Sequence, residues 1–362
     1  MTPPSLTSKE RVARAINHRE PDRVPINFYS NPGLLRRLLE HYGLPQGDVA
    51  GLHTILGVDF GSVNAPYRGP KLHPDIPERG LRVDNWGVRR RWIEHESGGY
   101  WDFCEFPLES ATPDEVADWP LPDPDDYDYS VIPEQCRKRK DLFVIAGNAG
   151  VVDIINANGR LRGMEQTLVD LITDDPAGLL LTQRRIDIQF EILKRTVQAA
   201  EGGVDMLHIG EDLGTQIPPI ISPEIFRKHI RPHHQRFVDL AEQYGIPVMI
   251  HTCGSSSWAY EDFIEMGVRV VDTLQPEAAG MAPEYLRDTF GERLAFHGCI
   301  STAGPVAFGT PEDVVRDCRN ILKIMMPGGG YCFAPTHALQ DNSPTENVVA
   351  MYETARTDGR YD

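Results

Sequence analysis

The sequence predicts a (β/α)8 barrel, also called a TIM barrel, with an irregular N-terminal elaboration. From residue 140 onward, short apolar runs alternate strictly with segments of helical pattern, which is typical of a parallel sheet covered by helices. The length of 362 residues suits one elaborated barrel domain. The alternative is an open doubly wound sheet. No Gly-x-Gly-x-x-Gly turn follows any of the expected strands, which argues against a dinucleotide-binding fold.

The expected elements divide the single domain, residues 1–362, near residue 135. Residues 1–135 are rich in proline; we expect a helix over residues 8–18, with Ser8 as its cap, and a first strand over residues 23–28. One more strand from this part is needed to complete eight, and residues 60–130 otherwise read as an irregular lid or dimer arm. In residues 136–362 we expect strands at 142–146, 204–209, 247–251, 268–272, 294–297 and 331–334, and helices at 161–172, 176–200, 223–244, 260–266, 283–290, 311–326 and 344–356.

Composition excludes several classes of function. The net charge of −17 argues against nucleic acid as a partner. No apolar run is long enough to cross a membrane. The N-terminal residues do not follow the basic-then-apolar order of a secretion signal, so we expect a cytoplasmic protein. Six cysteines without regular spacing do not suggest a disulfide framework, which leaves thiols available for metal binding.

Polar side chains gather at the ends of the predicted strands, where barrels of this type carry their chemistry. His251 and Cys253 lie two residues apart in the segment IPVMIHTCGS (residues 246–255). A lone histidine or cysteine here is usually a packing residue, but an imidazole and a thiol together indicate a zinc site. The other candidates at or near strand ends are Glu211, Asp212, Gln275, His297, Cys299, Cys332 and His337.

Several motifs make the chain resemble the uroporphyrinogen decarboxylase superfamily over nearly its whole length. They are KERVARAINHREPDRVP (9–25), GVD (57–59), GMEQTLVDL (163–171), GEDLGT (210–215), ISPEIF (221–226), FGTPED (308–313), GGGY (328–331) and PTENVVAMY (344–352). The resemblance implies a (β/α)8 barrel, in agreement with the strand and helix pattern. It also implies that Asp59 resembles the family's central aspartate, and that His337 resembles the histidine of a C-terminal motif.

The branch of the superfamily decides the expected chemistry. The decarboxylases share an arginine-rich segment after the first strand that holds the substrate's carboxylates. The corresponding residues here, INFYSNPGLLRR (26–37), do not contain the Arg-Gln-Ala-Gly-Arg pattern, so we do not expect uroporphyrinogen as the substrate. The chain is more similar to the cobalamin-dependent methyltransferases, in which a His-x-Cys pair and a later cysteine bind zinc. That resemblance implies His251, Cys253 and Cys332 as metal ligands, with Cys299 as an alternative or fourth ligand.

The resulting hypothesis is a zinc-dependent methyltransferase. It moves a methyl group between a small methoxy compound or thiol and a corrinoid such as methylcobalamin. The chain does not contain the Asp-x-His-x-x-Gly pattern of a corrinoid-binding domain, so the corrinoid comes from a partner protein or from solution. We expect Asp59, His337 and Glu211 to act in catalysis, and Asp212, Gln275 and His297 to bind the substrate.

Two other functions stay open on the sequence. One is a metal-independent decarboxylase or lyase of a small carboxylic acid, in which Asp59 and His337 do the chemistry. The other is a binding module that senses a corrinoid or metabolite without converting it. The chain is also a possible homodimer, since barrels of this superfamily often pair, although no surface stripe in the sequence marks an interface.

Overall fold

The centre of the molecule is a curled parallel sheet of seven strands in the order β1-β5-β6-β7-β8-β9-β10. The computed structural model describes residues 6–95 and 98–361, so the first five residues of the stretch considered for a secretion signal lie outside the described residues. The sheet strands are β1 (Phe60–Val63), β5 (Phe143–Gly147), β6 (Met206–Gly210), β7 (Val248–Thr252), β8 (Val270–Thr273), β9 (Ala295–Ile300) and β10 (Tyr331–Pro335). The predicted barrel class is confirmed, and each strand expected after residue 136 lies within two residues of an observed one at its start.

An extended segment around Ile26 closes the gap between β10 and β1. The Phe333 N–H donates to the Pro25 carbonyl at 2.8 Å, and the Asn27 N–H donates to the Phe333 carbonyl at 2.9 Å. On the other side, the Asp59 N–H donates to the Ile26 carbonyl at 2.8 Å. The predicted first strand is therefore the eighth member of the barrel, although only a single bridge forms, between Ile26 and Phe333. Pro25 offers no N–H and so limits the ladder.

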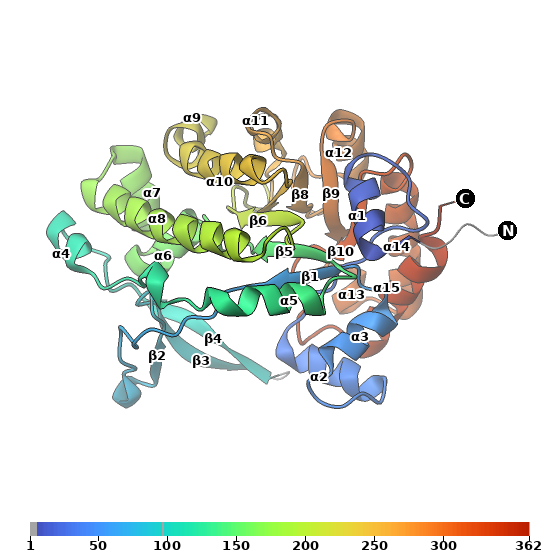
Figure 1. Cartoon of the computed structure of the whole chain (residues 1–362), viewed down its shortest axis with the longest axis horizontal. Coiled ribbons are helices and arrows are strands. Elements are labelled where there is room, and N and C mark those ends of the chain that lie inside the picture. The colour runs from blue at the N-terminus through green and yellow to red at the C-terminus, as the bar shows by residue number, and fades with distance from the viewer. Residues whose placement is uncertain (1–5, 96–97, 362) are drawn as a thin grey trace.

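Helices surround the strands (Figure 1). They are α1 (Ser8–Ile16), α2 (Pro32–His41), α3 (Val49–Leu56), α4 (Pro113–Asp118), α5 (Ile132–Lys138), α6 (Ile155–Arg162), α7 (Met164–Thr173), α8 (Pro176–Ala199), α9 (Pro223–Ile225), α10 (Arg231–Gln243), α11 (Tyr260–Met266), α12 (Pro283–Phe290), α13 (Pro305–Phe308), α14 (Pro311–Met325) and α15 (Thr345–Asp358). Across the described part of the chain, no helix combines the length and apolar character that a membrane span requires.

One apolar cluster fills the N-terminal end of the barrel. Val12, Ala15 and Ile16 of α1 pack there against strand residues such as Met249 and Ala295. The helical period places these α1 residues on one face, so α1 seals this end of the barrel. The opposite end, where the strands finish, is the end at which barrels of this type carry their active sites.

Three expectations need correction. Thr7, not Ser8, caps α1 in a capping box with Glu10, and the Ser8 hydroxyl donates instead to Asp59 at 2.8 Å. The helix expected over 161–172 is two helices, because Gly163 at φ 84° ends α6 and begins α7. The helix expected over 223–244 contains a π-helical turn at Phe226–Ile230 between α9 and α10.

Residues 60–130 are more ordered than the sequence suggests. They contain an antiparallel sheet of β2 (Leu81–Val83), β3 (Arg89–His95) and β4 (Gly98–Glu105), which lies below the barrel in Figure 1. β3 reads RRRWIEH and shows no alternation of apolar and polar residues, because most of its described side chains are exposed. β3 therefore produces no periodic signal, and the alternation in β2, which buries Leu81 and Val83, covers only three residues.

Candidate metal centre

Three neighbouring strands place His251, Asp272 and His297 in one row inside the barrel. In the parallel register His251 of β7 pairs with Asp272 of β8, which pairs in turn with His297 of β9. Residues in register on adjacent strands point to the same face of a sheet. The row therefore lies inside the barrel, next to the apolar cluster that contains Met249, Val270 and Ala295.

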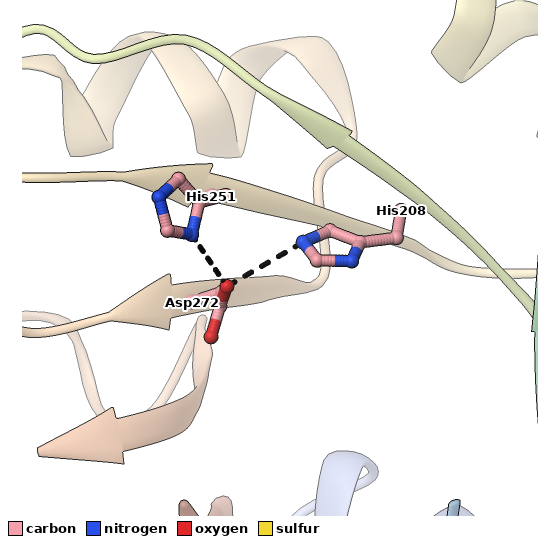
Figure 2. Close-up of side chains that lie close together, drawn as sticks. All are labelled: His208, His251 and Asp272. Atoms are coloured by element: carbon pink, nitrogen blue, oxygen red, sulfur yellow. Dashed lines mark hydrogen bonds and ion pairs between the residues drawn. The ribbon is translucent and has the colours of Figure 1, made fainter. Parts of the chain in front are cut away.

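Asp272 is the hub of this row. Its Oδ2 lies 2.7 Å from His251 Nδ1, and its Oδ1 lies 2.6 Å from His297 Nδ1. His208 of β6 reaches the same carboxylate, with Nε2 3.4 Å from Oδ2. Figure 2 shows His208 and His251 pointing at Asp272 from separate strands. The carboxylate thus orients His251 and His297 by hydrogen bonds and makes only an ion-pair contact with His208.

The charge of Asp272 sets the protonation of its neighbours. Burial alone would raise the pKa of Asp272, but His297, His208 and His251 outweigh it and hold this pKa well below the ordinary value. Burial lowers the pKa of His251, yet the hydrogen bond to Asp272 and the nearby Cys253 raise that pKa well above normal. Burial dominates at His208, whose pKa is lowered. The contacts thus favour the ionised form of Asp272, and they favour a proton on His251.

The outer nitrogen of His251 faces a thiol and a carboxylate. His251 Nε2 lies 3.4 Å from Cys253 Sγ and 3.7 Å from Asp212 Oδ1. Asp212, His251 and Cys253 each offer one ligand atom, and these atoms lie within 4.8 Å of one another. Because Nδ1 of His251 is occupied by Asp272, Nε2 is the nitrogen left for a metal. Imidazole, thiolate and carboxylate are all zinc ligands, and a second carboxylate that orients the histidine is usual in zinc proteins.

A second metal-capable grouping shares His251. His208, His251 and Asp272 also bring ligand atoms within 4.8 Å of one another. Here, however, Asp272 already accepts from His251 Nδ1 and His297 Nδ1. A metal at this point would compete with both hydrogen bonds, so the group containing Cys253 is the better candidate.

Two loops hold Cys253 in place. The Cys253 N–H donates to Asp212 Oδ1 at 2.9 Å, and the Gly214 N–H donates to the Cys253 carbonyl at 3.2 Å. Gly254, at φ 71°, lies so close to Gly214 that an added Cβ would come within 2.1 Å of its carbonyl oxygen. Only glycine fits there. The sequence HTCG therefore ends β7 in a turn that presses the thiol against the loop after β6.

Cys253 opens onto a cavity of about 340 Å³, a size suited to a small molecule. Gln275 lies in its wall, and the Gly254 N–H donates to Gln275 Oε1 at 3.0 Å. The lining residues are Cys253, Gln275, Thr302, Ala303, Phe308, Thr336, His337, Gln340 and Asn342. Among the described residues, four larger hollows of about 390 to 1090 Å³ lie elsewhere and are lined by neither His251 nor Cys253. The predictions for Asp212, Gln275 and His337 thus fall on residues that the structure brings beside the histidine–cysteine pair.

The structure does not bring Cys332 or Cys299 to this pair. Cys332 is in register with His297, and it is 1% exposed within the apolar cluster at the N-terminal end. β10 is three strand spacings of about 4.8 Å from β7, whereas a zinc–sulfur bond is about 2.3 Å long. Cys299 is fully buried in the outer core with Tyr260 and Tyr331. Burial raises the pKa of both thiols. The geometry therefore does not support Cys332 or Cys299 beside His251 and Cys253, whereas the Asp212 carboxylate lies within reach of both.

Three other expected site residues are engaged elsewhere. Asp59 is fully buried at the start of β1 and pairs with Arg11 and Arg23, each at 2.7 Å. Glu211 is also fully buried, and it accepts the Ile154 and Ile155 N–H groups at the start of α6, at 2.8 and 2.9 Å.

Burial raises the pKa of Glu211 to about 8, although the backbone hydrogen bonds partly oppose the rise. His297 is 1% exposed, and its Nε2 accepts from Asn27 Nδ2 at 3.1 Å. Asp59, Glu211 and His297 do not line the cavity, so the geometry does not support the catalytic and substrate-binding roles expected for them.

Sequence reasoning missed two members of the site, His208 and Asp272. Both lie inside strands whose residues are otherwise buried and mostly apolar. A charged or imidazole side chain in the middle of such a run needs a buried partner, and that is the signal that would have identified them. Attention to residues after the strand ends led instead to Gln275 and His297.

The fold and site together define a (β/α)8 barrel with a histidine, cysteine and carboxylate centre at the end where the strands finish. The family model for uroporphyrinogen decarboxylase (URO-D) matches residues 151–357. The chain therefore belongs to the uroporphyrinogen decarboxylase family. The resemblance expected from the sequence motifs is confirmed at this level.

The similar proteins include both a decarboxylase and a methyltransferase. A uroporphyrinogen decarboxylase of Azoarcus sp. is 26% identical over 145 residues, which cover 39% of this chain and 38% of that protein. The methylcobamide:CoM methyltransferase MtbA of Methanosarcina acetivorans is 22% identical over 159 residues, or 43% of each chain. The matches thus span about two fifths of these relatives.

A solved structure is similar over nearly the whole chain. A methyltransferase from Methanosarcina mazei superimposes with a TM-score of 0.60 at 19% identity, over 97% of this chain and 99% of that one. At this identity the likeness establishes the fold. The methyltransferases among the similar proteins agree with the branch that the His-x-Cys motif favoured.

Proposed function

We propose that this protein is a zinc-dependent methyltransferase that exchanges a methyl group between a small molecule and a corrinoid. The observation that carries the proposal is the convergence of Asp212, His251 and Cys253 beside a small cavity. The similarity to a methylcobamide:CoM methyltransferase supports the corrinoid as the other substrate. The corrinoid is presented by a partner protein or bound from solution.

Asp212, His251 and Cys253 would hold the zinc. Three protein ligands leave a position for a substrate thiol or oxygen, which bound zinc makes easier to deprotonate. Asp272 keeps His251 turned with Nε2 outward and strengthens it as a ligand. Gln275 and the cavity wall orient the small molecule. His337, on the same cavity wall, accepts the proton that the substrate loses.

The residues that line the cavity also help to decide between a methyltransferase and a decarboxylase. A substrate carboxylate is usually held by Arg or Lys. Among the described residues, those that line the cavity include neither. The cavity therefore favours the methyltransferase over a metal-independent decarboxylase of a small carboxylic acid.

The direct test is a methyl-transfer assay with zinc-loaded protein, methylcobalamin and a small thiol. The methyl group leaves cobalt without the bonding electron pair while the thiol loses its proton, so cob(I)alamin and a thioether appear together. Formation of cob(I)alamin can be followed by its absorption spectrum under anaerobic conditions. Turnover that requires zinc supports the proposal. Decarboxylation of a small acid by metal-free protein, without methyl transfer, would overturn it.

We expect an Asp272→Asn variant to bind zinc about 10- to 100-fold more weakly than wild type. Asparagine carries no charge, and it would place an NH2 donor against one of the two imidazole nitrogens that Oδ1 and Oδ2 of Asp272 now contact. Affinity can be measured by competition with a chromogenic chelator. Asp262→Asn is the matched control, because Asp262 is also a buried aspartate but pairs with Arg227 and Arg231. Equal affinities in the two variants would contradict the role of Asp272.

A His337→Ala variant should keep its zinc but lose about 100- to 10,000-fold in methyl-transfer rate, the usual range for removal of a general base. The exposed His41 at the end of α2 provides the control substitution, His41→Ala. Zinc content and rate are measured on the same samples. Loss of zinc from the His337 variant would place His337 among the ligands instead.

A further inference from the structure

We infer that the small-molecule substrate of this cavity carries no negative charge. The inference rests on the proposed function and deepens it, because it limits the chemical class of the methyl donor or acceptor. Its basis is the set of groups that the cavity offers, together with the charges around it.

The cavity wall offers uncharged hydrogen-bonding groups. Gln275 Oε1 accepts from the Gly254 N–H, which leaves the Gln275 amide nitrogen for a ligand. Thr302 and Thr336 bring their hydroxyls within 3.3 Å of each other. The side chain of Asn342 is exposed, and no hydrogen bond joins it to any described residue. Amides and hydroxyls recognise neutral polar groups, and no lining residue supplies the fixed positive charge that anion sites normally contain.

Carboxylates stand around this wall. Glu277 accepts from the hydroxyl of Ser301, immediately before the lining residues Thr302 and Ala303. Asp341 directly precedes the lining residue Asn342 and accepts from the Leu34 N–H at 2.8 Å.

The nearby cation Arg37 is directed at the backbone. Its Nη2 donates to the carbonyls of Asp341 and Ser343 at 2.8 and 2.9 Å, and Arg37 is not a lining residue. Beyond the metal-bound thiol, an anionic group of the ligand would lose water and approach the carboxylates of Glu277 and Asp341 with no lysine or arginine among the lining residues to offset them. A neutral ligand avoids this cost.

Three thiols of similar size separate charge from shape. They are 2-mercaptoethylamine, 2-mercaptoethanol and 2-mercaptoethanesulfonate, which present a cation, a neutral hydroxyl and an anion beyond the same thiol. Binding to zinc-loaded protein is measured by calorimetry, and the affinities are corrected for the pKa of each free thiol. We expect the sulfonate to bind at least about tenfold more weakly than mercaptoethanol. Equal or tighter binding of the sulfonate would overturn the inference.

A positive charge added to the cavity wall should make an anionic ligand bind more tightly. Asn342→Lys should raise the affinity for the sulfonate relative to mercaptoethanol by about two- to fivefold. Asn342→Gln, which keeps the amide, should leave this ratio as in wild type. A ratio that the lysine does not change would count against the inference.

The two proposals fail in distinguishable ways. A wild-type protein that binds no zinc overturns the proposed function and the inference that rests on it. A protein that binds zinc and prefers the sulfonate overturns only the inference about charge.

Discussion

A Cys253→Ser variant is expected to lose its zinc and its methyl-transfer activity, while a Cys332→Ala variant keeps both. Serine places a hydroxyl where a thiolate is needed, and a hydroxyl is a far weaker zinc ligand at neutral pH. Cys332 packs among apolar side chains such as Met249 and Ala295, so its loss removes only a small buried group. Elemental analysis of protein purified without chelator gives zinc per chain, with about one expected in wild type and in Cys332→Ala.

This pair of variants decides between the ligand set implied by the family resemblance and the set that the structure assembles. Asp212→Asn adds a third arm. If Asp212 is the third ligand, its amide should weaken zinc binding without unfolding the loop, because the side-chain oxygen can still accept from the Cys253 N–H. Zinc lost from Cys332→Ala and retained in Asp212→Asn would instead establish Cys332 as the ligand.

The regular half of the barrel was predictable because its strands are buried on both faces. Such strands appear as apolar runs, as in residues 142–146, and the helices between them show apolar residues at helical spacing. β3 is charged and mostly exposed over its described side chains, and β2 is only three residues long, so neither leaves a pattern that the sequence alone could reveal. The first strand was identified correctly, yet its pairing on both sides depends on β10 and β1, which lie far apart along the chain.

Within the site, the sequence showed which residues lie at the end of a strand, but it did not show which residues of different strands come close together. His251 and Cys253 were identified because they lie at the end of a strand in one short motif. Cys332 has a suitable spacing in sequence, but its register with His297 puts it two strands beyond Asp272 in the row. Asp212 becomes a neighbour of Cys253 only because the loops after β6 and β7 approach each other closely at Gly214 and Gly254. That contact is tertiary and has no local signature.

The second large effect is expected at the opposite end of the barrel, where Asp59→Ala should lower the free energy of unfolding by about 3 to 5 kcal/mol. Asp59 is fully buried, and its Oδ1 accepts from Arg11 Nη1 at 2.7 Å and from the Ser8 hydroxyl at 2.8 Å. Its Oδ2 accepts from Arg23 Nη1 at 2.7 Å and from the Ile26 N–H at 2.9 Å. The Asp59 carboxylate thus connects α1, the extended segment around Ile26 and β1.

The size of the effect follows from what alanine leaves behind. Arg11 is 6% exposed and keeps only Asp22 as an anionic partner, so part of its charge would be buried without compensation. The Ile26 N–H would also lose its acceptor, which weakens the segment that closes the barrel. Urea unfolding measures the change. Glu261→Ala, which removes an exposed pair with Arg293, should leave the unfolding curve almost unchanged.

The same variant separates a structural aspartate from a catalytic one. Below its unfolding temperature, Asp59→Ala should bind zinc as wild type does and retain most of its methyl-transfer rate, because Asp59 pairs with Arg11 and Arg23 outside the cavity. Asp59→Asn keeps an acceptor for the Ile26 N–H and should fold more stably than the alanine variant. If that better-folded variant lost activity as completely as Cys253→Ser, Asp59 would belong to the catalytic machinery, as the resemblance to the family's central aspartate implied.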